Sequence, residues 1–212
     1  MDFISDLLDF LNNFDFIKLI HTMGPFTYLI LFVIIFGETG FVVLPFLPGD
    51  SILFLAGMIA ASTGKMNVFI IFFVTFIAAV LGNITNYYIG YLFGAKILTH
   101  SKIIKQKHLE KTHKVFEKYG IQAIIVSRFV PIVRTIAPFV AGIGKMSRKK
   151  FHIYNLIGGF LWTFILVFSG YFLSIIPWVK ANPKFIILII LVVSLLPVVF
   201  EGVRHKFFSP KK

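Results

Sequence analysis

Apolar residues run through this chain in long uninterrupted stretches, which are separated by short polar segments. Residues 68–82, for example, carry no charged side chain. A helical segment needs about 20 mainly apolar residues to cross the roughly 30 Å hydrocarbon core of a bilayer. The pattern therefore predicts membrane-spanning helices over residues 66–95, 151–177 and 184–203.

The N-terminal residues follow a different pattern, in which apolar positions recur at helical spacing among acidic ones. The apolar positions are Phe3, Leu7, Phe10, Leu11, Phe14 and Ile17. The segment lacks the basic start of a secretory signal peptide. We therefore expect an amphipathic helix over residues 2–22 that lies in the membrane interface.

The composition supports an integral membrane protein. Hydrophobic residues make up 58% of the chain and charged residues only 14%, compared with about 25% charged residues in soluble domains. The net charge of +12 is explained by lysines and arginines that face anionic lipid, so no nucleic-acid partner is expected. The chain has no cysteine, which excludes disulfides and thiol chemistry. We expect one membrane domain over residues 1–212.

The basic residues predict the topology. They gather within residues 100–118, which we expect to form a cytoplasmic amphipathic segment, then within 145–150 and in the C-terminal tail. The positive-inside rule puts all three clusters on the cytoplasmic side. Because the first two clusters flank residues 121–143, that segment should enter the membrane and turn back. Residues 66–95 then cross once, which leaves the N-terminal helix on the outer face and the C terminus in the cytoplasm.

Residues 25–62 are predicted to form another re-entrant hairpin. Their second limb, 51–61, is about 16 Å long as a helix, roughly half the thickness of the hydrocarbon core. Non-helical backbone at membrane depth is tolerated only where protein buries it or water lines it. The residues expected to break the helices are Pro45, Pro48 and Gly49 in the first hairpin and Pro131 and Pro138 in the second.

An internal repeat relates the two halves. The sequence GKM at 64–66 recurs at 144–146, and Gly90-Tyr91 recurs as Gly170-Tyr171, both after 80 residues. Each half therefore contains one hairpin and one long helix, and a single crossing per half inverts the second copy. The predicted fold is an all-α polytopic membrane protein with an inverted repeat, flanked by the N-terminal amphipathic helix and a C-terminal transmembrane helix. Inverted repeats with broken helices are typical of transporters.

Four ionisable residues interrupt the apolar hairpins: Glu38 and Asp50 in the first, Arg128 and Arg134 in the second. Each such residue costs about 2.5–3.5 kcal/mol at the bilayer centre on insertion scales. Two acids on one hairpin and two bases on its partner should converge. The alternative is a set of ion pairs that only hold the hairpins together, but buried pairs are weak devices for stability. Four charges beside two chain breaks favour a functional site.

The chemistry of these side chains suggests their roles. Arginine stays charged and binds phosphate with a planar fork of donors, so Arg128 and Arg134 are the candidates for binding an anionic headgroup. A carboxylate that is poorly solvated can exchange a proton near neutral pH. Glu38 is therefore the preferred proton carrier, with Asp50 as its partner. Asp50 can also act as a helix N-cap or orient an arginine.

Three further polar residues lie on the predicted helix 66–95. Asn83, Asn86 and Tyr87 are candidates to line a cavity, and interhelical hydrogen bonding is an equally good explanation. The pattern indicates no metal site, no cofactor and no catalytic residue, and homo-oligomerisation stays open.

The hairpin motifs resemble those of the DedA family of bacterial inner-membrane proteins, relatives of the eukaryotic VTT-domain lipid scramblases. They read GETG at 37–40, PFLPGDS at 45–51 and SRFVPIVRTIAP at 127–138. The resemblance covers roughly residues 25–175. It implies two re-entrant hairpins in an inverted repeat and an essential acid pair and arginine pair, which fall on Glu38, Asp50, Arg128 and Arg134. It also implies a role in envelope homeostasis and lipid handling, with undecaprenyl phosphate or phosphatidylethanolamine as the lipid.

The function expected from these features is a proton-motive-force-coupled lipid translocase of the bacterial cytoplasmic membrane, with a phosphate-headed lipid and protons as its partners. The alternative transporter is an ion/proton or drug/proton antiporter, in which the arginines are structural. We do not expect an enzyme, because a lipid phosphatase needs a histidine nucleophile and neither hairpin contains a histidine. A non-catalytic assembly factor is the remaining alternative.

Overall fold

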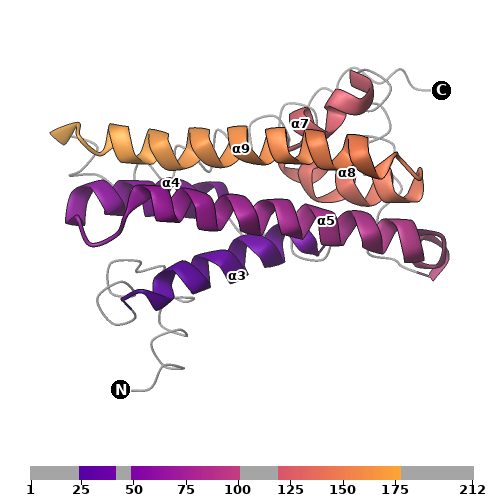
Figure 1. Cartoon of the computed structure of the whole chain (residues 1–212), viewed down its shortest axis with the longest axis horizontal. Coiled ribbons are helices and arrows are strands. Elements are labelled where there is room, and N and C mark those ends of the chain that lie inside the picture. Colours follow the sequence, from indigo (N-terminus) through magenta and orange to yellow (C-terminus); the bar gives the residue numbers. More distant parts are fainter. Residues whose placement is uncertain (1–23, 42–48, 101–118, 178–212) are drawn as a thin grey trace, which may run out of the picture.

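The structure, a computed structural model, describes residues 24–41, 49–100 and 119–177 (Figure 1). The regular elements in these ranges are all helical, which confirms the predicted all-α class. They are α3 (Phe26–Gly40), α4 (Gly49–Thr63), α5 (Val68–His100), the 3-10 turn η1 (Gly120–Gln122), α7 (Ala123–Ser127), α8 (Pro131–Ile143) and α9 (Arg148–Leu173).

Two long helices, α5 and α9, form the centre of the molecule and run in opposite directions (Figure 1). Phe69 near the start of α5 contacts Phe168 near the end of α9, with ring centroids 5.8 Å apart. Tyr88 near the other end of α5 lies 6.4 Å from His152 in the first turns of α9. Within the described ranges, α5 and α9 are the two helices long and apolar enough to cross a membrane. They confirm long apolar helices in the two regions predicted, 66–95 and 151–177, while the crossing of the membrane stays a prediction.

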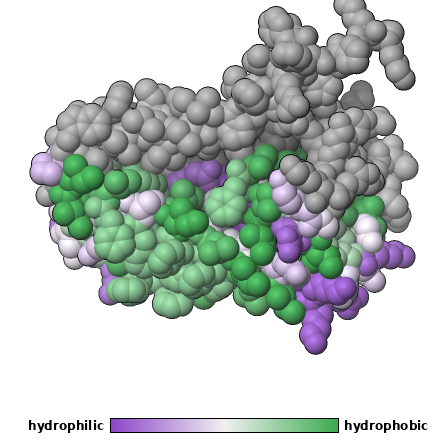
Figure 2. All heavy atoms as spheres, turned by 90° about the horizontal axis from the view of Figure 1, so that it is seen from above, coloured by the Kyte–Doolittle hydropathy of each residue, from purple (hydrophilic) through white to green (hydrophobic). Residues whose placement is uncertain are grey.

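The outer faces of these helices are strongly apolar. On α9 the exposed side chains include Ile153, Leu156, Phe160 and Phe164, and on α5 they include Phe69 and Phe73. Figure 2 shows an apolar band of this kind across one face, with hydrophilic side chains gathered toward one end. Exposed apolar surface of this extent is unusual for a soluble monomer, and it fits contact with lipid.

The shorter helices pack on the two long ones in a reciprocal way. In the first half, α3 packs along α5 while α4 packs along α9. In the second half, α7 packs on α9 while α8 packs along α5. The second limb of each half thus lies on the long helix of the other half. α4 has 15 residues, or about 22 Å, which is longer than the predicted limb 51–61 but shorter than the hydrocarbon core.

Glycines allow the closest of these helix crossings. A Cβ on Gly57 of α4 would collide with the carbonyl oxygen of Val167 on α9, and one on Gly170 would collide with the backbone of Phe54. The second crossing has the same design, since Gly142 of α8 lies against the backbone of Tyr87 on α5. Small residues that permit close backbone approach are typical of helix packing in membranes.

The second half shows where its helix is broken. α7 ends at Ser127, and α8 begins at Pro131, which occupies the first turn. A proline is tolerated there because the N–H that it lacks has no partner in the first turn of a helix. Pro138, in contrast, lies inside α8, so the prediction that it breaks the helix is wrong. Asn86 of α5 donates to the carbonyl oxygen of Thr135, 2.7 Å away, so α8 is tied to α5 about one turn before this proline.

Several predicted features lie outside the described residues. They are the amphipathic helix 2–22, the basic segment beyond His100, the helix 184–203, and the breakers Pro45 and Pro48. The inverted, re-entrant arrangement of the two hairpins stays a prediction.

Candidate functional site

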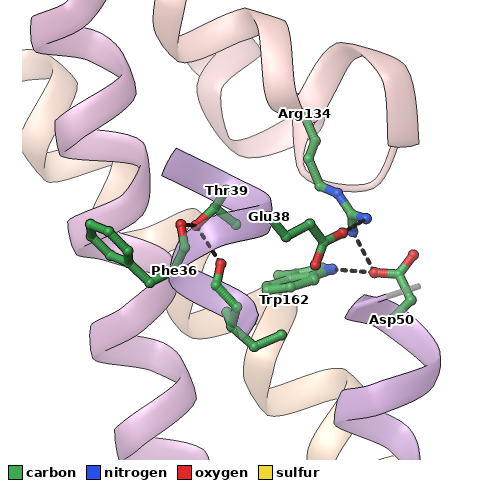
Figure 3. A network of polar contacts seen from close by, with 7 residues as sticks. Phe36, Glu38, Thr39, Asp50, Arg134 and Trp162 are labelled. Carbon is green, nitrogen blue, oxygen red and sulfur yellow. Dashed lines mark hydrogen bonds and ion pairs between the residues drawn. The ribbon is translucent and has the colours of Figure 1, made fainter. Parts of the chain in front are cut away.

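Arg134 joins the ends of three helices in the interior of the molecule (Figure 3). Its side chain comes from the first turns of α8 and lies between Glu38, in the last turn of α3, and Asp50, in the first turn of α4. Arg134 Nη1 donates to Asp50 Oδ1 over 2.5 Å, and Nη2 donates to Glu38 Oε1. Glu38 is fully buried and Arg134 is 6% exposed, whereas the side chain of Asp50 keeps 19% of its exposure.

Trp162 of α9 completes this cluster. Its indole N–H donates to Asp50 Oδ1 over 3.0 Å, and the guanidinium carbon of Arg134 lies 5.2 Å from the centre of its ring. An indole ring attracts a cation through its π face. Trp162 therefore positions both an acid and the base, and we call Glu38, Asp50, Arg134 and Trp162 the bridge cluster.

Gly49 is required by the bridge cluster. A Cβ at this position would overlap the carboxylate of Glu38. The close approach brings the start of α4 directly against this carboxylate, and a helix N-terminus is a favourable place for a negative charge. The fold thus holds the buried Glu38 between a cationic side chain and a helix N-terminus.

Arg128 lies in a separate environment made of neutral groups. Its Nη2 donates to Asn155 Oδ1 over 2.6 Å and approaches the carbonyl oxygen of Ala79 at 3.3 Å. Two consecutive glycines of α9, Gly158 and Gly159, make room for the side chain, since a Cβ on either would lie within 3.3 Å of an Arg128 atom. Arg128 is 2% exposed, and among the described residues no carboxylate forms an ion pair with it.

Asn155 is itself fixed by two bonds to α5. Its Nδ2 donates to the carbonyl oxygen of Val80 over 3.1 Å, and its Oδ1 accepts from Asn83 Nδ2 over 3.0 Å. These contacts define which end of the amide faces Arg128. The amide oxygen of Asn155 therefore serves as a neutral acceptor for a buried cation.

Asn86 and Tyr87 form hydrogen bonds between helices. Asn86 Nδ2 donates to the carbonyl oxygens of Thr39 on α3 and Thr135 on α8, at 3.3 and 2.7 Å. These residues directly follow Glu38 and Arg134, so Asn86 holds the backbone beside both members of the buried ion pair. Tyr87 donates to the carbonyl oxygen of Met146 over 2.6 Å. Asn83 bonds Asn155 of α9 in the same way. All three polar residues predicted on this helix thus form hydrogen bonds between helices, in agreement with the interhelical interpretation rather than the cavity-lining one.

The predicted convergence of the four charges is only partly seen. Both acids meet on one arginine, Arg134, while Arg128 is bound by an amide and a backbone carbonyl. Asp50 adopts the role of orienting an arginine, because its Oδ1 accepts from Arg134.

Asn155 and Trp162 were not predicted as site residues. The available signal was that each carries hydrogen-bonding groups within an apolar helix, where such groups need partners.

The arrangement can respond to protons and to anions. A buried carboxylate–guanidinium pair weakens when the carboxylate takes up a proton, and a freed guanidinium binds phosphate well. Within the described ranges, no group of three or more histidine, aspartate or glutamate side chains is placed to hold a metal ion.

Comparison with known proteins identifies the family of the chain. Residues 47–172 match the VTT domain. The chain is 49% identical to Protein DedA of Escherichia coli (strain K12) over 211 residues, which cover 97% of this chain and 96% of that protein. It is 33% identical to the inner membrane protein YqjA of the same strain over 180 residues, 84% of this chain and 81% of that protein. A membrane protein of Mycobacterium tuberculosis is 38% identical over 175 residues, 81% of this chain and 77% of that protein.

No solved structure matches the chain. The domain match covers more than half of the sequence, and the similarity to Protein DedA extends over nearly its full length. The chain therefore belongs to the DedA family of VTT-domain membrane proteins.

Proposed function

We propose that this protein moves a phosphate-headed lipid across the bacterial inner membrane and that the proton motive force drives this movement. The observation that carries this proposal is the buried bridge, in which Arg134 links Glu38 and Asp50 at the meeting point of α3, α4 and α8. Buried ionisable groups in a membrane protein usually mark the path of a substrate, an ion or a proton.

The bridge suggests how a proton and a phosphate are coupled. When Glu38 is ionised, it occupies Arg134. Protonation of Glu38 weakens this bond, and the guanidinium becomes able to donate to phosphate oxygens instead. Loss of the proton lets Glu38 reclaim Arg134 and displace the phosphate. Asp50 is the more exposed of the two acids. It keeps Arg134 oriented in both protonation states of Glu38.

The packing of the helices supports alternating access to this site. α4 lies on α9 as α8 lies on α5, with a glycine at each crossing. Such reciprocity is what an inverted repeat produces, and transporters of this design open alternately to the two sides around a site near the midplane. The hydrocarbon tail of the lipid stays in the bilayer, beside the exposed apolar faces of α5 and α9.

Undecaprenyl phosphate is the cargo that we favour, and a phospholipid is the alternative. A phosphate monoester has several free oxygens and a net negative charge, which suit the planar donors of a freed guanidinium. The topology that we propose leaves the C terminus in the cytoplasm and the N-terminal helix on the outer face, in line with the positive-inside rule.

Reconstitution tests the proposal. Purified protein in liposomes with an imposed pH gradient is assayed for the sidedness of undecaprenyl phosphate, for wild type, Glu38→Gln and Arg134→Ala. The matched control is Lys149→Gln, which removes an exposed charge at the start of α9. We expect gradient-dependent movement for wild type and the control and none for the two bridge variants. Equal movement in all four proteins would contradict the proposal.

The other function classes give different results in the same preparation. An ion/proton or drug/proton antiporter would move a soluble cation without any lipid. A lipid phosphatase would release inorganic phosphate. An assembly factor would move nothing, and exchanging the charges of Glu38 and Arg134 would restore its cellular phenotype.

A further inference from the structure

The two buried arginines differ in the charge of their partners. Arg134 donates to two carboxylates, whereas Arg128 donates to the amide of Asn155 and to a backbone carbonyl. We propose that Asn155 keeps Arg128 free of a carboxylate partner, so that the site selects a lipid headgroup of net negative charge and carries it together with a proton. This inference rests on the proposed function and specifies its substrate class and coupling.

The geometry shows that the neutrality of this partner is built in. Asn155 Nδ2 is committed to the carbonyl oxygen of Val80, so its oxygen faces Arg128 Nη2 at 2.6 Å. An aspartate has nearly the same shape as an asparagine and would place a carboxylate oxygen at the same point. A buried cation normally needs an opposite charge, whereas the amide accepts a hydrogen bond from Nη2 without cancelling the charge of Arg128. Nε of Arg128 is buried and makes no hydrogen bond, and the same holds for Nε of Arg134.

The charges around the site can be counted. The three ionised bridge residues, Glu38, Asp50 and Arg134, carry one negative charge in total, and Arg128 balances it from a separate position. The helices packed around them contribute only neutral groups to these contacts, namely Asn83 and Asn86 from α5 and Asn155 and Trp162 from α9. With all four charged residues ionised, the site is therefore neutral overall.

Proton uptake changes this balance. When Glu38 is protonated, the four residues carry one net positive charge. Such a charge is unfavourable in a low-dielectric interior, and one negative charge on a bound headgroup cancels it. Binding of the proton therefore favours binding of the anion, and by linkage the anion favours the proton to the same extent. A zwitterionic headgroup leaves the positive charge uncompensated.

This balance also predicts the direction of coupling. The proton and the anionic headgroup occupy the site together and leave it together, so the lipid moves in the same direction as the proton. In a proton gradient, the lipid should accumulate in the leaflet toward which protons flow.

Asn155→Asp is the most direct test, because it changes charge at nearly constant shape. We expect wild type in liposomes to move undecaprenyl phosphate at least about tenfold faster than phosphatidylethanolamine, a difference of about 1.4 kcal/mol. Because Asn155→Asp also loses the donor to the Val80 carbonyl oxygen, its folding is checked first, and the folded variant should lose at least about tenfold in binding and movement of the phosphate lipid. The matched control is Asn67→Asp, the same exchange at an exposed position that caps the start of α5, which should behave as wild type.

A second pair of variants covers the case in which Asn155→Asp does not fold. Arg128→Lys keeps the positive charge and should keep the preference for the anionic lipid, while Arg128→Gln should lose it. The inference is overturned if phosphatidylethanolamine moves as fast as the phosphate lipid, if folded Asn155→Asp equals wild type, or if the lipid moves against the proton flow.

Binding separates this inference from the proposed function. Binding of undecaprenyl phosphate to purified protein is measured by native mass spectrometry, without any transport. If wild type binds this lipid in an Asn155-dependent way but moves no lipid, the translocation proposal fails and the anion site stands. If wild type moves both lipids equally, translocation stands and the charge selection fails.

Discussion

Trp162 donates its indole N–H to Asp50 Oδ1 over 3.0 Å, so a helix of the second half fixes a carboxylate of the first. The same oxygen accepts from Arg134 at 2.5 Å. This shared acceptor holds α4, α8 and α9 together at one point (Figure 3). A change in the pairing of Arg134 is therefore transmitted directly to the packing of helices from both halves.

Trp162→Phe tests this contact. Phenylalanine keeps an aromatic face toward Arg134 but cannot donate to Asp50. A hydrogen bond to a charged group contributes about 1.5–3 kcal/mol, so we expect a stability loss of that size and roughly tenfold slower transport. Thermal unfolding in detergent and the liposome assay measure the two effects. An unchanged unfolding temperature with unchanged transport would show that the indole N–H has no role.

Removing Arg134 should be more harmful to folding than removing the charge of Glu38. Arg134→Ala leaves two carboxylates buried or half-buried without their cation, and breaking a buried pair in this way costs about 3–5 kcal/mol. Glu38→Gln leaves Arg134 paired with Asp50, and the cost should be smaller.

The double variant Arg134→Ala/Glu38→Gln gives a control for that interpretation. It removes one of the two unpaired carboxylates, so it should be more stable than Arg134→Ala alone, although it should not transport. Stability losses that simply add would indicate that Glu38 and Arg134 are not coupled.

Replacing a glycine at a helix crossing should lower the stability of the protein much more than replacing a glycine that has open space beside it. Gly57→Ala places a Cβ against the Val167 carbonyl oxygen and the Tyr171 amide, and overpacking of this kind costs about 1–3 kcal/mol. Gly142→Ala should have a similar effect, because its environment on α5 is equivalent. Gly37→Ala is the control, since a Cβ at Gly37 meets nothing within 4 Å. Equal stabilities of all three variants would contradict the close packing described above.

Asn86 should be needed for the alignment of the bridge. Asn86→Ala removes two buried interhelical hydrogen bonds, each of which contributes about 0.5–1.5 kcal/mol. We expect lower stability together with slower transport. Thr85→Ala is a suitable control, because the exposed hydroxyl of Thr85 bonds only within its own helix in the described contacts. An Asn86→Ala protein as stable as Thr85→Ala would contradict this role.

The positions of the site residues were accessible from the sequence, but their pairing was not. An apolar stretch such as 68–82 has few structures available besides a buried or lipid-facing helix, and charges within such stretches stand out because they are costly. Which acid meets which arginine depends on how α3, α4 and α8 pack, and periodicity carries no such information. The expected clamp of two arginines on one ligand therefore became one bridged arginine and one with neutral partners.

The roles of three other residues could not be predicted from the sequence either, namely those of Asn155, Trp162 and Pro138. Asparagine and tryptophan in apolar helices have several ordinary explanations, and only the contacts with Arg128 and Asp50 distinguish them. Proline normally ends a helix, but Pro138 lies inside α8, and periodicity alone does not reveal where a packed helix continues through a proline.

The most direct test of the whole account is proton-driven lipid movement by the purified protein. Liposomes that contain wild type, Glu38→Gln or Lys149→Gln are loaded with undecaprenyl phosphate, and a pH gradient is imposed in each direction in turn. The account predicts that wild type and Lys149→Gln move the lipid toward the leaflet that receives protons, that reversal of the gradient reverses the movement, and that Glu38→Gln moves none. Lipid movement that ignores the gradient, or that continues in Glu38→Gln, would contradict it.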